Sequence, residues 1–87
     1  MHKLFIERYI KQIKKDDILK FGIQNDIHLS NEQLDILYHY LNEFWEVILY
    51  GNREKVFLDM KKRFDEDTFL KMQKLFEEYF NRYKDLL

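Results

Sequence analysis

The sequence contains no cysteine and no proline, and only two of its 87 residues are glycine. Without cysteine the chain can form neither a disulfide nor a cysteine-ligated zinc site, which fits a protein of the reducing cytoplasm. Proline and glycine are the residues that interrupt helices most strongly, so their scarcity favours helices joined by short connections. We therefore expect an all-α fold in which residues 1–87 form a single helical domain.

Long uninterrupted apolar runs are also missing from the sequence. Leu4-Phe5-Ile6 is followed directly by Glu7 and Arg8, so the apolar segment of a secretory signal peptide does not form there. No stretch approaches the roughly 20 apolar residues that a membrane-spanning helix needs. We expect a cytoplasmic protein without a membrane partner. Apolar residues nevertheless make up 46% of the chain and aromatic residues 17%, which is enough to build a core without disulfides or metals.

The clearest local signal is a long helix between Ser30 and Gly51. Ser30 and Gln33 form a capping-box pattern, and glycine at position 51 suits the left-handed residue that often follows a helix. Spacings of three and four define a main apolar stripe of Leu34, Leu37, Tyr38, Leu41, Phe44, Trp45 and Ile48. A second apolar set projects to another side and consists of Ile36, Tyr40 and Val47. A helix with two apolar sides is either the central helix of the monomer or, in part, an interface with another chain.

Shorter helices are expected on either side of this central helix. Apolar spacing predicts helical segments over residues 3–13 and 16–24, either as two helices or as one kinked helix. Gly22 in the second segment indicates a close approach of another helix, with a hinge as the alternative. Asn52 is placed to cap a helix over residues 53–64, and Asp65 is placed to cap a last helix. The apolar stripe of that last helix consists of Phe69, Met72, Leu75, Phe76, Tyr79, Phe80, Tyr83 and Leu86. The predicted fold is a small orthogonal bundle of four or five helices, which could form two helix-turn-helix pairs.

Residues 13–41 also carry a recognisable order of signals. Asp16-Asp17-Ile18-Leu19-Lys20-Phe21 is followed by Ile27-His28-Leu29-Ser30-Asn31-Glu32-Gln33. This stretch resembles a small family of uncharacterised all-helical proteins from Gram-positive bacteria. In that family a short helix is followed by a Gly-Ile-x-Leu-type turn and then by a Ser/Thr-x-Glu-Gln helix start. The sequence departs from that family by Asp26, where a glycine is expected, and by Phe44-Trp45. The resemblance implies a domain of unknown function, so it assigns no activity and no site residue.

The sequence contains no complete catalytic or metal-binding pattern. There is no glycine-rich phosphate loop and no arrangement of a nucleophile with a nearby base. His39 and Glu43 are four residues apart and could supply two metal ligands, but a site needs three or four. Asp65-Glu66-Asp67 lies at a junction too short for a calcium-binding loop, and helix capping explains it. We expect no enzymatic activity, no cofactor and no bound metal.

Two functional interpretations remain. The leading one is a small protein–protein interaction module that self-associates or docks on another protein through apolar surface on the central and last helices, with a candidate interface of Ile36, Tyr40, Trp45 and Val47. The alternative is a nucleic-acid-associated regulator with a helix-turn-helix-like bundle, whose contacts would be Lys11, Lys14, Lys15, Lys61, Lys62 and Arg63. No lysine or arginine occurs between Lys20 and Arg53, so the central helix would repel phosphates. The charge pattern therefore disfavours the nucleic-acid alternative.

Overall fold

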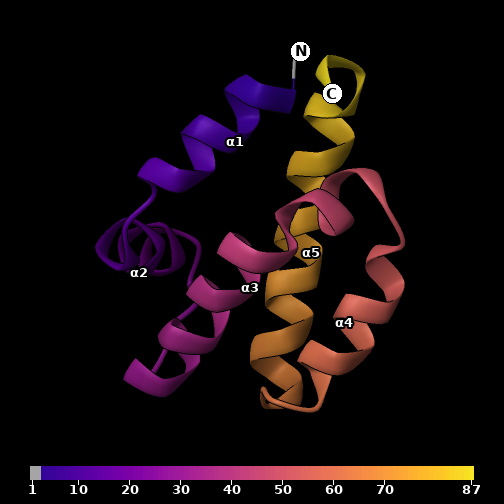
Figure 1. Cartoon of the computed structure of the whole chain (residues 1–87). Coiled ribbons are helices and arrows are strands. Elements are labelled where there is room, and N and C mark those ends of the chain that lie inside the picture. The colour runs from indigo at the N-terminus through magenta and orange to yellow at the C-terminus, as the bar shows by residue number, and fades with distance from the viewer. Residues whose placement is uncertain (1–2) are drawn as a thin grey trace.

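Five α-helices and a short 3₁₀ helix make up most of residues 3–87, the part of the chain that the computed structural model describes (Figure 1). They are α1 (Lys3–Gln12), α2 (Lys15–Gln24), α3 (Asn31–Tyr50), α4 (Arg53–Lys61), α5 (Glu66–Tyr83) and η1 (Lys84–Leu86). In Figure 1, α1 and α2 lie on one side of α3 and α4 lies on the other, while α5 runs past α3. The predicted all-α bundle around one long central helix is confirmed.

The first 24 residues form two helices rather than one kinked helix. Helix α1 ends at Gln12, and α2 begins at Lys15 after a two-residue break. The backbone amide of Lys14 donates a hydrogen bond of 2.9 Å to the carboxylate of Asp17. This bond satisfies an amide that would otherwise have no partner at the start of a helix, so it fixes the new start.

Helix α3 begins and ends at the predicted residues, Asn31 and Tyr50, but the conformation of the residue after it differs from the prediction. The Ser30 hydroxyl accepts a hydrogen bond from the Gln33 amide at 3.1 Å, and the Gln33 side chain accepts one from the Ser30 amide at 2.9 Å. Gly51, however, has φ = −121° and is extended, so the predicted left-handed conformation is wrong. Arg53 explains the difference, because its guanidinium donates to the carbonyls of Ile48 at 2.7 Å and Leu49 at 3.3 Å. A side chain thus satisfies the carbonyl groups that a left-handed glycine turn would otherwise satisfy.

The turn between α4 and α5 is longer than predicted. Helix α4 ends at Lys61, three residues before the predicted end at position 64, and Phe64 then turns into the core. Asp65 caps α5 as predicted, accepting a hydrogen bond of 3.0 Å from the Thr68 amide. Asn52 precedes α4, but its side chain makes no capping hydrogen bond within the described residues.

The interior is divided into two groups of buried side chains, both of which contact α3. The major cluster joins α3, α4 and α5 and consists of Tyr40, Val56, Met60, Phe64 and Phe69. The minor cluster joins α1 to the second half of α3 and consists of Ile6, Ile10 and Trp45. Because α3 contributes to both, it is covered on more than one side, as its two apolar sides require.

Two backbone features shape the connection after α2. A Cβ atom on Gly22 would lie 2.8 Å from the Ile27 carbonyl oxygen, and the Ile27 amide donates to the Gly22 carbonyl at 2.7 Å. Gly22 is therefore closely approached, as predicted, but by the connection that follows α2 and not by another helix. Asp26 has φ = 59°, a left-handed conformation that aspartate tolerates better than most residues. This is the position where the family pattern has a glycine, which adopts such a conformation freely.

Candidate functional site

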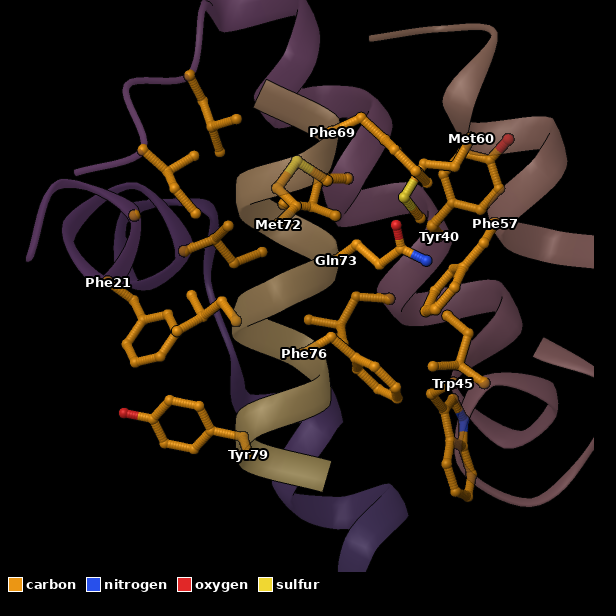
Figure 2. A pocket seen from close by; sticks show the side chains of 18 of the residues that line it. Phe21, Tyr40, Trp45, Phe57, Met60, Phe69, Met72, Gln73, Phe76 and Tyr79 are labelled. Atoms are coloured by element: carbon orange, nitrogen blue, oxygen red, sulfur yellow. The ribbon is translucent and has the colours of Figure 1, made fainter. Parts of the chain in front are cut away.

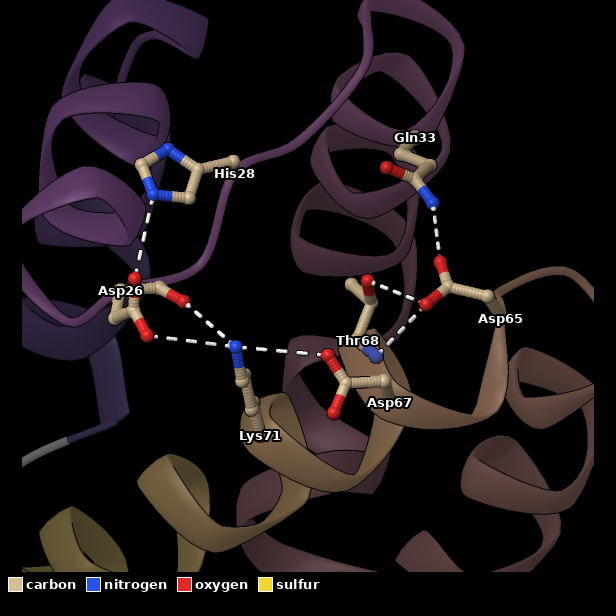
Figure 3. A network of polar contacts seen from close by, with 7 residues as sticks. All are labelled: Asp26, His28, Gln33, Asp65, Asp67, Thr68 and Lys71. Atoms are coloured by element: carbon tan, nitrogen blue, oxygen red, sulfur yellow. Dashed lines mark hydrogen bonds and ion pairs between the residues drawn. The ribbon is translucent and has the colours of Figure 1, made fainter.

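A polar network anchors the first turns of α5 to the rest of the bundle (Figure 3). Lys71 Nζ donates to the Asp26 carbonyl at 3.3 Å and lies 3.5 Å from the carboxylates of both Asp26 and Asp67. Gln33, at the start of α3, donates to the Asp65 carboxylate at 3.0 Å. These contacts tie the beginning of α5 to the connection after α2 and to the start of α3.

Two ionisable groups of this network, Asp65 and Lys71, have pKa values that are shifted by their partners. Hydrogen bonds from the Thr68 amide and hydroxyl hold the pKa of Asp65 below its ordinary value. The nearby carboxylates of Asp26 and Asp67 raise the pKa of Lys71. Asp65 and Lys71 are therefore both held in their charged forms. Because both are exposed to solvent, the network positions α5 more than it stabilises the fold.

Packing along α5 weakens from its first half to its second. Phe69 is only 5% exposed and belongs to the major cluster, whereas Tyr79 is 36% and Tyr83 is 47% exposed. On the side facing α4, the Phe76 ring packs edge-on against Phe57 with centroids 5.2 Å apart. The predicted apolar stripe of α5 is therefore core at its start and partly surface at its end.

An apolar cavity of about 360 Å³ lies between α2, α3 and α5 (Figure 2). Its wall includes Phe21 from α2, Leu37 and Trp45 from α3, and Met72 and Phe76 from α5. The two clusters meet at this cavity without closing it, because residues of both line it. The lining is almost entirely carbon, so the cavity offers nearly no hydrogen-bonding partner to water.

A second and more polar space adjoins this cavity, and we call it the outer hollow. Its volume is about 730 Å³, and its lining includes Gln12, Asp17 and Lys20. The cavity and the outer hollow share four lining residues, Ile18, Phe21, Leu41 and Tyr79. The rings of Phe21 and Tyr79 meet edge-on with centroids 5.5 Å apart. This ring pair stands between the apolar cavity and the polar hollow.

Aromatic side chains are exposed around the outer hollow. Tyr9, which is 69% exposed, and Phe21 approach it from α1 and α2. From α5, the rings of Tyr79 and Tyr83 stack with centroids 6.3 Å apart, and the Arg82 guanidinium lies 5.0 Å from the Tyr79 centroid. We call these five residues the aromatic surface. Tyrosine and arginine are the residue types that most often carry binding energy in protein interfaces.

The four predicted interface residues do not share one surface. Tyr40 is only 3% exposed and lies in the major cluster, where its hydroxyl hydrogen-bonds to Asp59. Burial raises the pKa of Tyr40, and the hydrogen bond to Asp59 raises it further. Trp45 is buried in the minor cluster, Ile36 is half-buried against the major cluster, and Val47 is exposed. Because α3 is covered on both sides, Tyr40 and Trp45 present no surface to a partner of the monomer.

The six basic residues of the nucleic-acid alternative lie in two separate places. The break between α1 and α2 is flanked by Lys11, Lys14 and Lys15. The end of α4 and the connection to α5 carry Lys61, Lys62 and Arg63. Figure 1 shows these two junctions on opposite sides of the bundle. Lys15 is also paired with Asp35 of α3 at 2.7 Å. The fold therefore does not gather these charges on one surface, as phosphate binding would require.

Metal binding and membrane spanning are two further possibilities for residues 3–87. No group of three or more histidine, aspartate or glutamate side chains in that range is placed to hold a metal ion. His39 packs edge-on against the rings of Tyr40 and Phe44, with centroids 6.2 and 6.1 Å away. None of the helices in residues 3–87 combines the length and apolarity needed to cross a bilayer.

Comparison with known proteins gives no match: no family model, no curated protein and no solved structure resembles this chain significantly. The resemblance of residues 13–41 to a Gram-positive family therefore stays a prediction. What the fold itself defines is a small all-α protein with an apolar cavity behind an exposed aromatic surface.

The sequence predicted apolar docking surface on the last helix but not the cavity or which residues of that helix are exposed, although one signal pointed to them. Helix α5 has 18 residues and carries an apolar stripe along most of its length, whereas the neighbouring α4 has only nine. A helix half as long cannot cover the whole stripe. The mismatch in length therefore indicates apolar surface on the second half of α5.

Proposed function

We propose that this chain is a small, non-catalytic protein–protein interaction module of the cytoplasm that docks through its aromatic surface. The observation that carries the proposal is the stack of Tyr79 and Tyr83 with Arg82 beside it, exposed next to Phe21. Such side chains offer a large apolar area at a small cost in conformational entropy. Contiguous apolar surface on a small protein is typical of interaction sites.

The charges near the aromatic surface favour a second copy of this chain as the partner. Asp17 and Lys20 line the outer hollow and carry opposite charges, and Arg82 adds a positive charge on α5. In a two-fold symmetric dimer the same surface faces itself, so a surface of one sign would repel its copy. A surface with both signs around an apolar centre can pair opposite charges across the two-fold axis.

Light scattering after size-exclusion chromatography tests this proposal. We expect the wild type to be dimeric at high protein concentration and Tyr79→Asp to be monomeric, because a charge would be buried in the interface. Leu58→Asp is the matched control, since Leu58 lies on α4, is 63% exposed and does not belong to the aromatic surface. It should leave the mass unchanged. A wild type that stays monomeric at every concentration, at low and high salt, would exclude self-association through this surface.

A further inference from the structure

We infer that the cavity between α2, α3 and α5 binds the single alkyl chain of an amphiphile, with the polar head in the outer hollow. This inference concerns the interior of the bundle and does not require the proposed self-association, but the two share Phe21 and Tyr79, so a dimer formed through the aromatic surface would compete with entry of the chain. It follows from the size of the cavity, from the chemistry of its wall and from the nature of the adjoining space.

The size of the cavity limits what it can hold. A volume of about 360 Å³ lies at the lower end of the range for small-molecule sites in proteins. With roughly 30 Å³ for each water-sized group, the cavity holds about twelve such groups. One unbranched chain of roughly ten to twelve carbon atoms fits this limit. A two-chain lipid does not.

The wall of the cavity selects an apolar guest. Among residues 3–87, none of the side chains that line it is charged, and Gln73 is the one amide. A charged or strongly polar group placed inside would lose its hydration without compensation. Met60 and Met72 belong to the wall, and their flexible side chains adjust easily to an alkyl chain.

The outer hollow supplies a place for the polar head. It adjoins the cavity at Phe21 and Tyr79 and is lined by polar groups that include Gln12, Asp17 and Lys20. A head group there stays hydrated while its chain passes the ring pair into the cavity. The second half of α5 carries Tyr79 and lies beyond the polar network that anchors the helix, so it is the part of the wall best able to adjust.

The chain-length dependence of binding tests the inference, with Trp45 as the reporter. Trp45 is the single tryptophan of the protein and lines the cavity, so its emission should change when an alkyl chain enters. We expect 1-hexanol, 1-octanol, 1-decanol and 1-dodecanol to bind with increasing affinity, by about fourfold for each added methylene group. Cyclododecanol has as many carbon atoms as 1-dodecanol but cannot extend as a single chain past the rings of Phe21 and Tyr79, so it should bind at least about tenfold more weakly.

A variant that fills the cavity makes the test specific. Leu37→Phe adds volume inside the cavity and should weaken binding of 1-dodecanol by about tenfold or more. Leu58→Phe makes the same change on the exposed face of α4 and should leave the affinity unchanged. Circular dichroism checks that both variants fold. If Leu37→Phe does not fold, the inference is tested by comparing the affinities of the wild type for 1-dodecanol and cyclododecanol.

Three results would overturn the inference. They are an unchanged Trp45 emission with every alcohol, equal affinity for 1-dodecanol and cyclododecanol, and unchanged affinity in a folded Leu37→Phe. A monomeric wild type would disprove the proposed self-association but would leave these measurements unaffected, so the two failures are distinguishable.

Discussion

The two halves of α5 belong to the same helix but are held in different ways. In the first half, Phe69 is buried beside Met60, and Lys71 ties the helix to Asp26. In the second half, Tyr79 and Tyr83 are partly exposed, and the α5 wall of the apolar cavity, which begins at Phe69, ends at Tyr79. The difference shows that an apolar stripe becomes core only as far as its neighbours reach. Beyond that point the same residue types form surface and cavity wall, where they are available for binding.

Among the variants that test the difference between the two halves of α5, we expect Phe69→Ala to lose the most stability. Removing a buried phenylalanine from the major cluster should lower the free energy of unfolding by about 3 to 5 kcal/mol. Tyr79→Ala in the second half should cost clearly less, because part of that ring is already in water. Urea unfolding followed by circular dichroism gives both values. Equal losses would show that the two halves of α5 contribute equally to the core.

A smaller effect is expected from Gly22→Ala, which probes the α2 wall of the cavity. Alanine favours a helix over glycine by about 1 kcal/mol, so helix propensity alone predicts a more stable variant. The new Cβ would lie 2.8 Å from the Ile27 carbonyl oxygen, and this contact should cost about 1 to 3 kcal/mol. We therefore expect a net loss in stability, or at best no gain, in thermal unfolding.

Gln24→Ala is the control for that measurement, since Gln24 is exposed near the end of the same helix. It should change the free energy of unfolding by no more than about 0.5 kcal/mol. A Gly22→Ala variant more stable than the wild type would contradict the close approach of Ile27 to α2.

The smallest effect distinguishes two tyrosine hydroxyls of α3. The Tyr40 hydroxyl bonds to Asp59, so Tyr40→Phe should lower the free energy of unfolding by about 1 kcal/mol. The Tyr50 hydroxyl is buried without a hydrogen-bond partner within the described residues, so Tyr50→Phe should be neutral or slightly stabilising. Urea unfolding of the two variants at pH 7 gives the comparison. A loss at Tyr50 as large as that at Tyr40 would mean that the Tyr50 hydroxyl is bonded after all.

The Tyr40 hydroxyl also makes stability depend on pH. Its pKa in the folded protein is raised above the ordinary value of 10.0, so the folded state favours the protonated form. The stability gained in this way is fully present below pH 10 and is lost as the pH rises through the folded-state pKa. Tyr40→Phe should therefore lose less stability above pH 10 than the wild type does.

The sequence predicts the features that depend on neighbouring residues. The hydrogen bonds of Ser30 with Gln33 and of Asp65 with Thr68 are local, and both were predicted helix starts. The end of α3 at Tyr50 was also predicted, but the conformation of Gly51 was wrong because it depends on Arg53, whose guanidinium reaches back to the last carbonyls. A side-chain contact of this kind leaves no periodic signal in the sequence.

The candidate site was harder to predict because it depends on packing between distant segments. Tyr40 and Val47 are on the same apolar side in the sequence pattern, but only Tyr40 is covered by α4 and becomes core. Periodicity shows that a face is apolar and does not show how far a neighbouring helix covers it. The cavity depends on the same property, since it lies where the two clusters meet without filling the space between them.

Amide hydrogen exchange along α5 tests the contrast between its two halves most directly. We expect the amides of residues 69–73 to exchange slowly, with the stability of the whole fold, and those of residues 76–83 to exchange faster through local opening. Saturating 1-dodecanol should slow exchange in both segments, because a ligand that binds only the folded protein raises the stability of the whole fold, and residues of both segments line the cavity. Uniform slow exchange along the whole of α5 without any alcohol would contradict the account, because it would mean that both halves are packed equally well.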